Sequence, residues 1–149
     1  MTLPDGLADR IARIESRAQI ADTVHGYAYA IRHGRPEDAV ALFTEDGVFE
    51  TREGMPGQVD PVIRSRIEGR AAFHAYLTKG DVASVTMCPM IHNLMITIDG
   101  AKASATSVMV GRMLGTSHSI IGEYQDSLRY EGKWMFAERI YTIFPTGGR

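Results

Sequence analysis

His92 is the residue whose type and position most directly suggest chemistry. If residues 90–98 form a strand, strict alternation places His92 on one face with Leu94, Ile96 and Ile98. An imidazole in a row of aliphatic side chains is either a hydrogen-bonded core residue or a group facing a ligand cavity. In a cavity it could act as a general base. The alternation alone leaves both interpretations open.

Two charged residues occupy strand positions that alternate with apolar ones. Arg139 alternates with Ala137 and Tyr141, and a cation in these surroundings needs an anionic partner. That partner is a substrate oxygen, a carboxylate or a backbone carbonyl. Asp126 shares a face with Tyr124, so it either approaches a pocket or pairs with a neighbouring strand.

Residues suited to line an apolar pocket are spread along the chain. Of the eight methionines, several fall in or beside residues 88–115, where flexible thioethers fill core gaps or line pockets for bulky apolar ligands. Tyr27 is a candidate phenol donor to a carbonyl or hydroxyl. The predicted pocket residues are Arg32, Phe43, Phe49, Phe73, Met95, Met109, Tyr124 and Asp126.

Composition narrows the classes of function. The chain has 149 residues, enough for one domain over residues 1–149 with its own hydrophobic core. A net charge of −2 without a long run of one sign argues against binding to nucleic acid or an anionic membrane. A single cysteine, Cys88, excludes an internal disulfide and suits a reducing compartment, so we expect a cytoplasmic protein. No metal-ligand spacing or glycine-rich phosphate loop is present, so we expect no metal and no cofactor.

Helical patterns precede a run of strands. The spacing predicts helices over Leu7–His33, Pro36–Phe43 and Ala71–Lys79, a first strand from Val48 and a surface loop over Arg52–Ser65. A hairpin over Cys88–Gly115 turns at Asp99-Gly100, and strands follow over Ser117–Tyr130 and Lys133–Phe144. This order is typical of an α+β fold in which helices cover one face of a curved antiparallel sheet, leaving a wedge-shaped cavity between them.

The order of several local motifs resembles the SnoaL-like and scytalone dehydratase-like branch of the nuclear transport factor two-like (NTF2-like) superfamily. The motifs include residues 41–49 (ALFTEDGVF), residues 122–126 (GEYQD) and residues 131–139 (EGKWMFAER). The resemblance implies a cone-shaped fold with a deep apolar pocket. It also implies dehydratase-type elimination by a pocket histidine paired with an aspartate, without a cofactor.

Residue by residue, the resemblance gives His92 as the base, with Tyr27 and Arg139 as further catalytic residues. The family's aspartate has no match, because Arg32 occupies its position. A cation there would lower the pKa of a nearby imidazole and would not orient it.

Three hypotheses follow. The first is a lyase or isomerase acting on a cyclic or polycyclic hydroxy or carbonyl compound. The second is a non-catalytic protein that binds such an apolar ligand. The third is a partner-binding domain that acts through the outer face of its sheet, and in any of the three we expect a homodimer or homotrimer.

Overall fold

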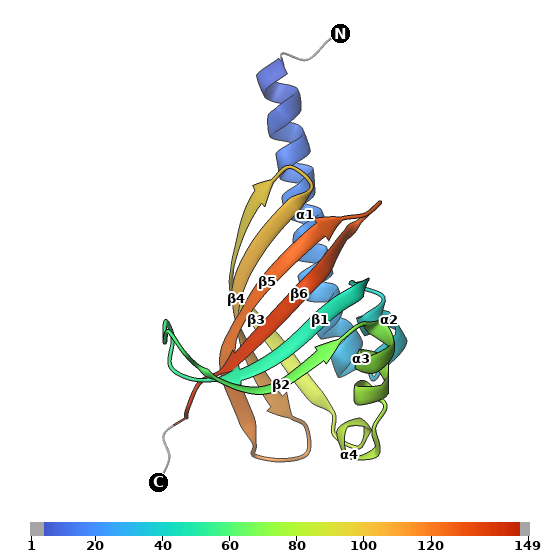
Figure 1. Ribbon diagram of the computed structural model, residues 1–149, viewed down its shortest axis with the longest axis vertical. Helices are drawn as coiled ribbons and strands as arrows, with labels where there is room; N and C mark the ends of the chain where they lie inside the picture. The colour runs from blue at the N-terminus through green and yellow to red at the C-terminus, as the bar shows by residue number, and fades with distance from the viewer. Residues whose placement is uncertain (1–4, 147–149) are drawn as a thin grey trace.

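A six-stranded sheet curves around one long helix in the computed structural model, which describes residues 5–146 (Figure 1). The helices are α1 (Asp5–Arg32), α2 (Pro36–Val40), α3 (Arg70–Leu77) and α4 (Gly80–Ala83). The strands are β1 (Phe43–Glu53), β2 (Val62–Glu68), β3 (Met87–Asp99), β4 (Lys102–Met113), β5 (Ser119–Tyr130) and β6 (Trp134–Ile143). The predicted α+β architecture is confirmed.

The strand order is β2-β1-β6-β5-β4-β3, with β1 parallel to β6 and every other pair antiparallel. The hairpin from β3 to β4 turns at Gly100-Ala101, one residue beyond the predicted Asp99-Gly100, because Asp99 still pairs with Lys102; Gly100 has a φ of 60°. Pro89 lies in the edge strand β3, where its missing N–H costs the sheet no hydrogen bond.

The core lies between α1 and the inner face of the sheet. Alternate residues of β4 are buried from Ala103 to Gly111, as expected for a strand with one covered face. Buried side chains of α1, among them Ile20, Val24 and Tyr27, pack into the same core. The ring of Tyr27 lies 6.0 Å from that of Phe43, so aromatic packing joins the long helix to the first strand.

The strand β2 lies partly inside the predicted surface loop over Arg52–Ser65. Its outward positions are charged or exposed, so the sequence carries little of the apolar alternation that marks a strand. Phe43, predicted to end a helix, instead begins β1 and pairs with Phe136 of β6.

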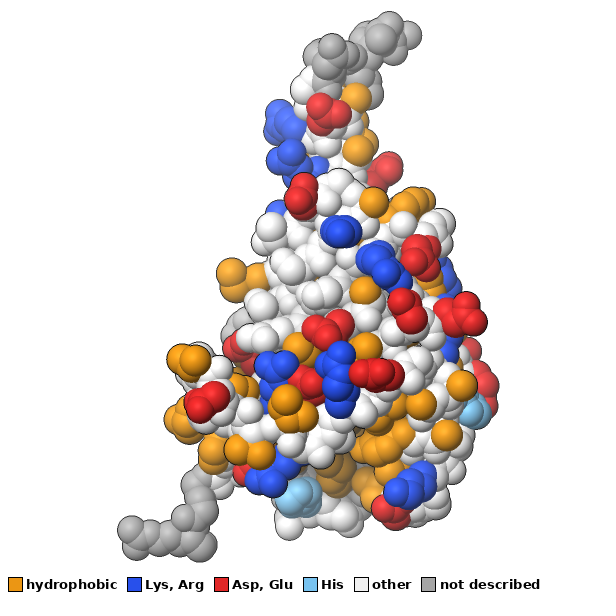
Figure 2. Space-filling model, in the orientation of Figure 1, with side chains coloured by type: hydrophobic (Ala, Val, Ile, Leu, Met, Phe, Trp, Pro, Cys, Tyr) orange, Lys and Arg blue, Asp and Glu red, His pale blue; other side chains and the backbone are white. Residues whose placement is uncertain are grey.

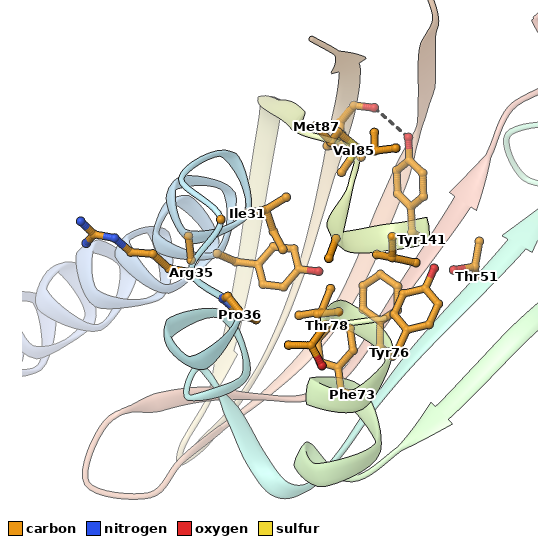
Figure 3. Close-up of a pocket in the computed structure, with 18 of the residues that line it drawn as sticks. Ile31, Arg35, Pro36, Thr51, Phe73, Tyr76, Thr78, Val85, Met87 and Tyr141 are labelled. Atoms are coloured by element: carbon orange, nitrogen blue, oxygen red, sulfur yellow. Dashed lines mark hydrogen bonds between the residues drawn. The ribbon is translucent and has the colours of Figure 1, made fainter. Parts of the chain in front are cut away.

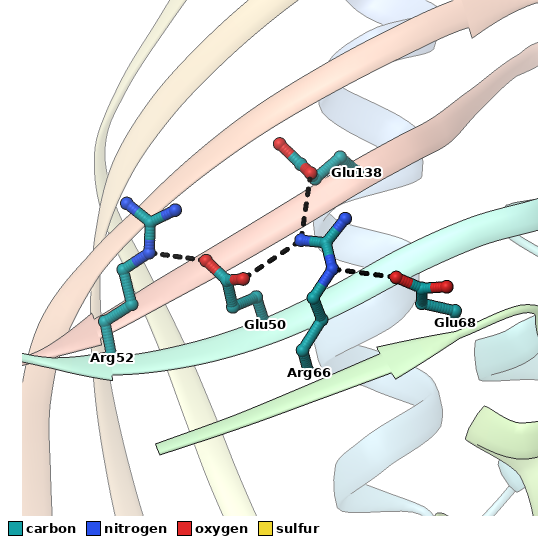
Figure 4. A network of polar contacts seen from close by, with 5 residues as sticks. All are labelled: Glu50, Arg52, Arg66, Glu68 and Glu138. Carbon is teal, nitrogen blue, oxygen red and sulfur yellow. Dashed lines mark hydrogen bonds and ion pairs between the residues drawn. The ribbon is translucent and has the colours of Figure 1, made fainter. Parts of the chain in front are cut away.

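An ion network on the outer face of the sheet holds β2 in place (Figure 4). The carboxylate of Glu50 on β1, whose side chain is only 2% exposed, accepts hydrogen bonds from Arg52 and Arg66. Arg66 of β2 also pairs with Glu68 at 2.9 Å and with Glu138 of β6 at 3.6 Å. These charges gather over the middle of this face (Figure 2), tying together three strands.

A bulge interrupts the alternation of β3. His92 pairs with Val108 and Met95 with Thr106, so Asn93 and Leu94 together stand opposite the single residue Ser107. Asn93 adopts a φ of 54°, a left-handed conformation that asparagine tolerates better than most residues. The bulge shifts the alternation by one residue, with consequences for His92 described below.

The first turns of α1 project beyond the sheet (Figure 1). Residues 6–15 are all exposed, and the first buried residue of the helix is Ile20. Within residues 5–146, no helix combines the length and apolar character needed to cross a membrane.

Candidate functional site

An apolar pocket of about 500 Å³ opens at the C-terminal end of α1 (Figure 3). Its walls come from α1, α3, the segment around α4 and the inner face of the sheet. The volume lies in the range of small-molecule sites. The polar or charged residues in the lining are Tyr27, Arg35, Thr51, Tyr76, Thr78, Tyr124 and Tyr141, and the remainder are apolar or glycine.

Arg35 is the one lining residue with a charged side chain, and Figure 3 shows its guanidinium directed away from the cavity. The guanidinium lies 5.8 Å from the ring of Tyr29 and 4.0 Å from the carboxylate of Asp38. The interior therefore presents hydroxyl groups and apolar surface to a ligand.

Two buried phenols, Tyr27 and Tyr124, define the polar part of the cavity. They are 3% and 1% exposed, and their hydroxyls make no hydrogen bond to other groups within residues 5–146. Burial raises the pKa of both phenols, so each stays protonated near neutral pH and can donate a hydrogen bond.

A third phenol, Tyr141, is already committed to the protein. Its hydroxyl donates a hydrogen bond to the backbone carbonyl of Met109 at 3.0 Å (Figure 3). Gly122 lies against this ring, and a Cβ added there would lie 2.7 Å from Tyr141 Cζ and would overlap the carbonyl oxygen of Thr142. The absence of a side chain at residue 122 therefore fixes where Tyr141 packs.

A buried ion pair lies in the inner face of the sheet beside these phenols. Asp126 on β5 and Arg139 on β6 are direct cross-strand partners, and both side chains are fully buried. Arg139 Nε lies 3.0 Å from Asp126 Oδ1 without hydrogen-bond alignment, while Nη2 donates to Oδ2 at 3.5 Å. The carboxylate is thus the anionic partner that Arg139 requires.

The guanidinium of Arg139 is also sandwiched by aromatic rings. Its Cζ lies 3.5 Å from the ring centroid of Tyr124, 4.4 Å from that of Phe136 and 4.6 Å from that of Tyr27. Burial raises the pKa of Asp126 to about 6, and the attraction of Arg139 offsets this only in part. Neither Asp126 nor Arg139 lines the cavity, whereas Tyr27 and Tyr124, whose rings contact the guanidinium, do line it.

A family model described as the SnoaL-like domain matches residues 12–140 of the chain. The chain belongs to this family. No curated protein sequence matches it.

Solved structures share the fold of this SnoaL-like domain. A variant of Rv3472 from Mycobacterium tuberculosis, of unknown function, is 25% identical over 92% of this chain and 75% of that one, with a TM-score of 0.72. An NTF2-like protein from Novosphingobium aromaticivorans is 21% identical over 96% and 91%, with a TM-score of 0.75. A candidate scytalone dehydratase from the same organism is 20% identical over 92% and 91%, with a TM-score of 0.70. The predicted membership of the NTF2-like superfamily is confirmed.

His92 does not face the pocket of this SnoaL-like domain. It is exposed and pairs with Val108 on the outer face of the sheet, so the expectation of an inward imidazole is wrong. The cause is the bulge at Asn93 and Leu94, which adds one residue to β3. Ile91 and Leu94 therefore face inward, and His92, which follows Ile91, faces outward. Met95 is 69% exposed, so its predicted place in the pocket is also wrong.

Arg32 and Phe43 were also expected in the pocket and lie elsewhere. Arg32 is exposed and stacks on Tyr29 at 5.0 Å, beside a separate shallow hollow between α1 and β3. Phe43 is 1% exposed and belongs to the core, with its ring 5.1 Å from that of Phe136. Arg32, which the resemblance set at the position of the expected aspartate, therefore does not reach the cavity.

The remaining predicted residues converge. Tyr27, Phe49, Phe73, Met109 and Tyr124 all line the pocket, and Asp126 and Arg139 lie beneath it. Their roles toward a ligand stay predictions.

The sequence-based prediction missed five of the polar or charged lining residues: Arg35, Thr51, Tyr76, Thr78 and Tyr141. Tyr141 could have been found, since it shares a strand face with Arg139 two residues away. Among residues 5–146, no group of three or more His, Cys, Asp or Glu residues is placed to hold a metal ion.

Proposed function

We propose that this SnoaL-like domain binds a small cyclic or polycyclic apolar molecule that carries a carbonyl or hydroxyl oxygen. One observation carries the proposal: Tyr27 and Tyr124 line a mainly apolar cavity, and their hydroxyls have no partner within residues 5–146. Both hydroxyls are therefore free to donate to a ligand acceptor, while the apolar wall binds the rest of the molecule.

The bicyclic ketone 2-tetralone and its parent hydrocarbon tetralin test this proposal. We expect the ketone to bind more tightly than the hydrocarbon, as measured by calorimetry. Tyr27→Phe or Tyr124→Phe should raise the dissociation constant of the ketone about fivefold, the worth of one hydrogen bond, and leave that of tetralin unchanged.

Tyr130→Phe is the matched control, because Tyr130 is 49% exposed and lies outside the pocket. His92→Ala is a second control, since the imidazole lies on the outer face. Equal loss of ketone binding in a control and in Tyr27→Phe would contradict the proposal, as would no binding of either probe.

Lyase or isomerase chemistry through an enolate is the second candidate. It is supported by the similarity to a candidate scytalone dehydratase and by the Arg139 guanidinium lying 3.5 Å from the Tyr124 ring. A cation in that place would stabilise negative charge shared between the phenol and an enolate oxygen. The outward His92 has no part in this reaction, and no carboxylate or imidazole of residues 5–146 lines the cavity, so a water molecule would accept the α-proton.

Deuterium exchange separates the two candidates. An enolising protein accelerates exchange of the α-protons of 2-tetralone in D₂O above the buffer rate, and Tyr124→Phe reduces that acceleration. Binding of 2-tetralone without accelerated exchange would support a non-catalytic binding protein and contradict the enzymatic candidate.

A further inference from the structure

The projecting half of α1 carries an apolar stripe that no other part of residues 5–146 covers. Leu7 is 37% exposed, Ile11 39% and Ile14 65%, and Ala18 is exposed as well. Figure 2 shows hydrophobic side chains along one side of the projecting helix and basic side chains along the other. Three large aliphatic side chains exposed along one face of a projecting helix are typical of a surface that binds a partner.

The spacing of the stripe is that of a coiled coil. Leu7, Ile11, Ile14, Ala18 and Ala21 are separated by alternating steps of four and three residues, a mean period of 3.5. Because an α-helix has 3.6 residues per turn, such a stripe drifts by about 20° per heptad.

The stripe lies on a different side of α1 from the residues that enter the core. At 100° per residue, Leu7 to Ala18 point about 150° away from the direction of the buried residues Ile20, Val24 and Tyr27. A second helix can therefore lie along Leu7 to Ala18 without meeting the core of its own chain.

The charges beside the stripe select one orientation of such a partner. Arg10 and Arg17 lie along one flank and Glu15 and Asp22 along the other. In a parallel, in-register pair, each flank faces the opposite flank of the other helix, which sets Arg10 against Glu15 and Arg17 against Asp22. An antiparallel pair would place like charges together.

We propose that residues 7–21 form a parallel, two-stranded coiled coil with the same segment of a second copy of this chain. A helix of this length is marginal by itself, but here it continues α1, whose lower half is fixed in the core. Arg17 Nη1 also donates to the carbonyl of Ile96 at 2.9 Å, holding the base of the projection against β3. Little ordering remains to oppose association.

Sedimentation equilibrium of the full chain tests the assembly. We expect a dimer, and we expect Ile11→Glu and Ile14→Glu to raise its dissociation constant on the order of a hundredfold, because each places a charge in the apolar seam of both chains. Ile63→Glu is the matched control: Ile63 is 58% exposed, lies on β2 away from α1, and should leave the dimer intact. Circular dichroism at equal concentrations checks that each variant is folded.

Charge exchange tests the orientation. Arg10→Glu or Glu15→Arg alone should weaken the dimer about tenfold, and an equimolar mixture of the two variants should regain wild-type association. Ile14→Cys in a Cys88→Ser background should form an interchain disulfide on oxidation, since position 14 meets itself only in the parallel register.

Three results would overturn the proposal. They are a monomer at about 100 µM, a dimer indifferent to Ile11→Glu and Ile14→Glu, and a dimer that Arg10→Glu strengthens, which would indicate antiparallel pairing. Flotation of a monomeric wild-type chain with neutral phosphatidylcholine vesicles would assign the stripe to a lipid surface and likewise reject the coiled coil.

Discussion

At the residue scale, the Asp126–Arg139 pair is the most consequential feature of the interior. Asp126→Ala leaves the guanidinium of Arg139 buried without its carboxylate, and we expect a loss of about 3–5 kcal/mol in the free energy of unfolding. Urea denaturation measures this. Replacing both partners, as Asp126→Leu with Arg139→Met, should recover most of the loss, because an apolar pair leaves no unpaired charge. A double variant as unstable as Asp126→Ala would contradict this account.

The same carboxyl group predicts a pH dependence. The pKa of Asp126 is raised to about 6 in the folded chain from an ordinary value of 3.8, so between these values the folded state binds more protons than the unfolded state. Its contribution to stability is therefore fully present below about pH 4 and is lost as the pH rises through 6. We expect the free energy of unfolding of wild type minus that of Asp126→Asn to fall across this interval, as measured by urea denaturation at several pH values. If this difference in the free energy of unfolding rises with pH or stays constant, the raised pKa of Asp126 is contradicted.

Individual residues were predictable where the backbone followed a regular period. Tyr27, Phe49, Phe73, Met109 and Tyr124 reach the pocket because helix and strand periodicity holds at their positions. Asp126 and Arg139 were each placed on an inward face, but their pairing depends on the register between β5 and β6, which no local pattern specifies.

At the element scale, the bulge of β3 decides which face each residue of the hairpin presents. Asn93→Val places a β-branched residue at a φ of 54°, and we expect it to lower the free energy of unfolding by about 1–2 kcal/mol. Asn93→Gly, which tolerates the conformation, should change it by less than about 0.5 kcal/mol. Guanidinium denaturation compares the two. Equal effects would show that the conformation of residue 93 is not what destabilises the valine variant.

In β5, Gly122 is the position where the backbone packs most closely against a neighbouring side chain, that of Tyr141. Gly122→Ala drives a methyl group into Tyr141 and the carbonyl of Thr142, so we expect a loss of about 2 kcal/mol or more and a displaced Tyr141 ring at the pocket wall. Gly80→Ala, where nothing lies within 4 Å of the added methyl, is the control and should be close to neutral. Thermal denaturation with and without 2-tetralone measures stability and pocket shape together. An unchanged variant in both measurements would contradict the close packing at Gly122.

Three features of the sheet show where prediction from sequence periodicity is right and where it is wrong. The hairpin turn was predicted to within one residue because its chemistry is local: Gly100 adopts the positive φ that the turn requires. The strand β2 was missed because arginines and glutamates from three strands stabilise its outer side, and such a network is visible only after folding. The prediction that His92 faces inward was wrong for a similar reason. One extra residue in β3 moves the side chains that precede it to the opposite face of the sheet.

At the scale of the whole molecule, the fold class was predictable because helices precede strands along the entire chain. The volume of the cavity was not, since it depends on how α3 and α4 close the open end of the curved sheet. The projecting half of α1 was expected to be continuous with the buried half. Its separate character comes from a change of helix face, because Leu7 to Ala18 point about 150° away from Ile20, Val24 and Tyr27.

The long helix has its free stripe at one end and the cavity mouth at the other (Figure 1). Two chains joined at the first end would hold their mouths well apart, each admitting ligand without reference to its neighbour. We therefore expect saturation curves of simple hyperbolic form, with the same half-saturation concentration whether the chain is dilute or concentrated. Calorimetric titrations across a wide range of protein concentration check this, and sigmoidal saturation would reveal communication along the helix.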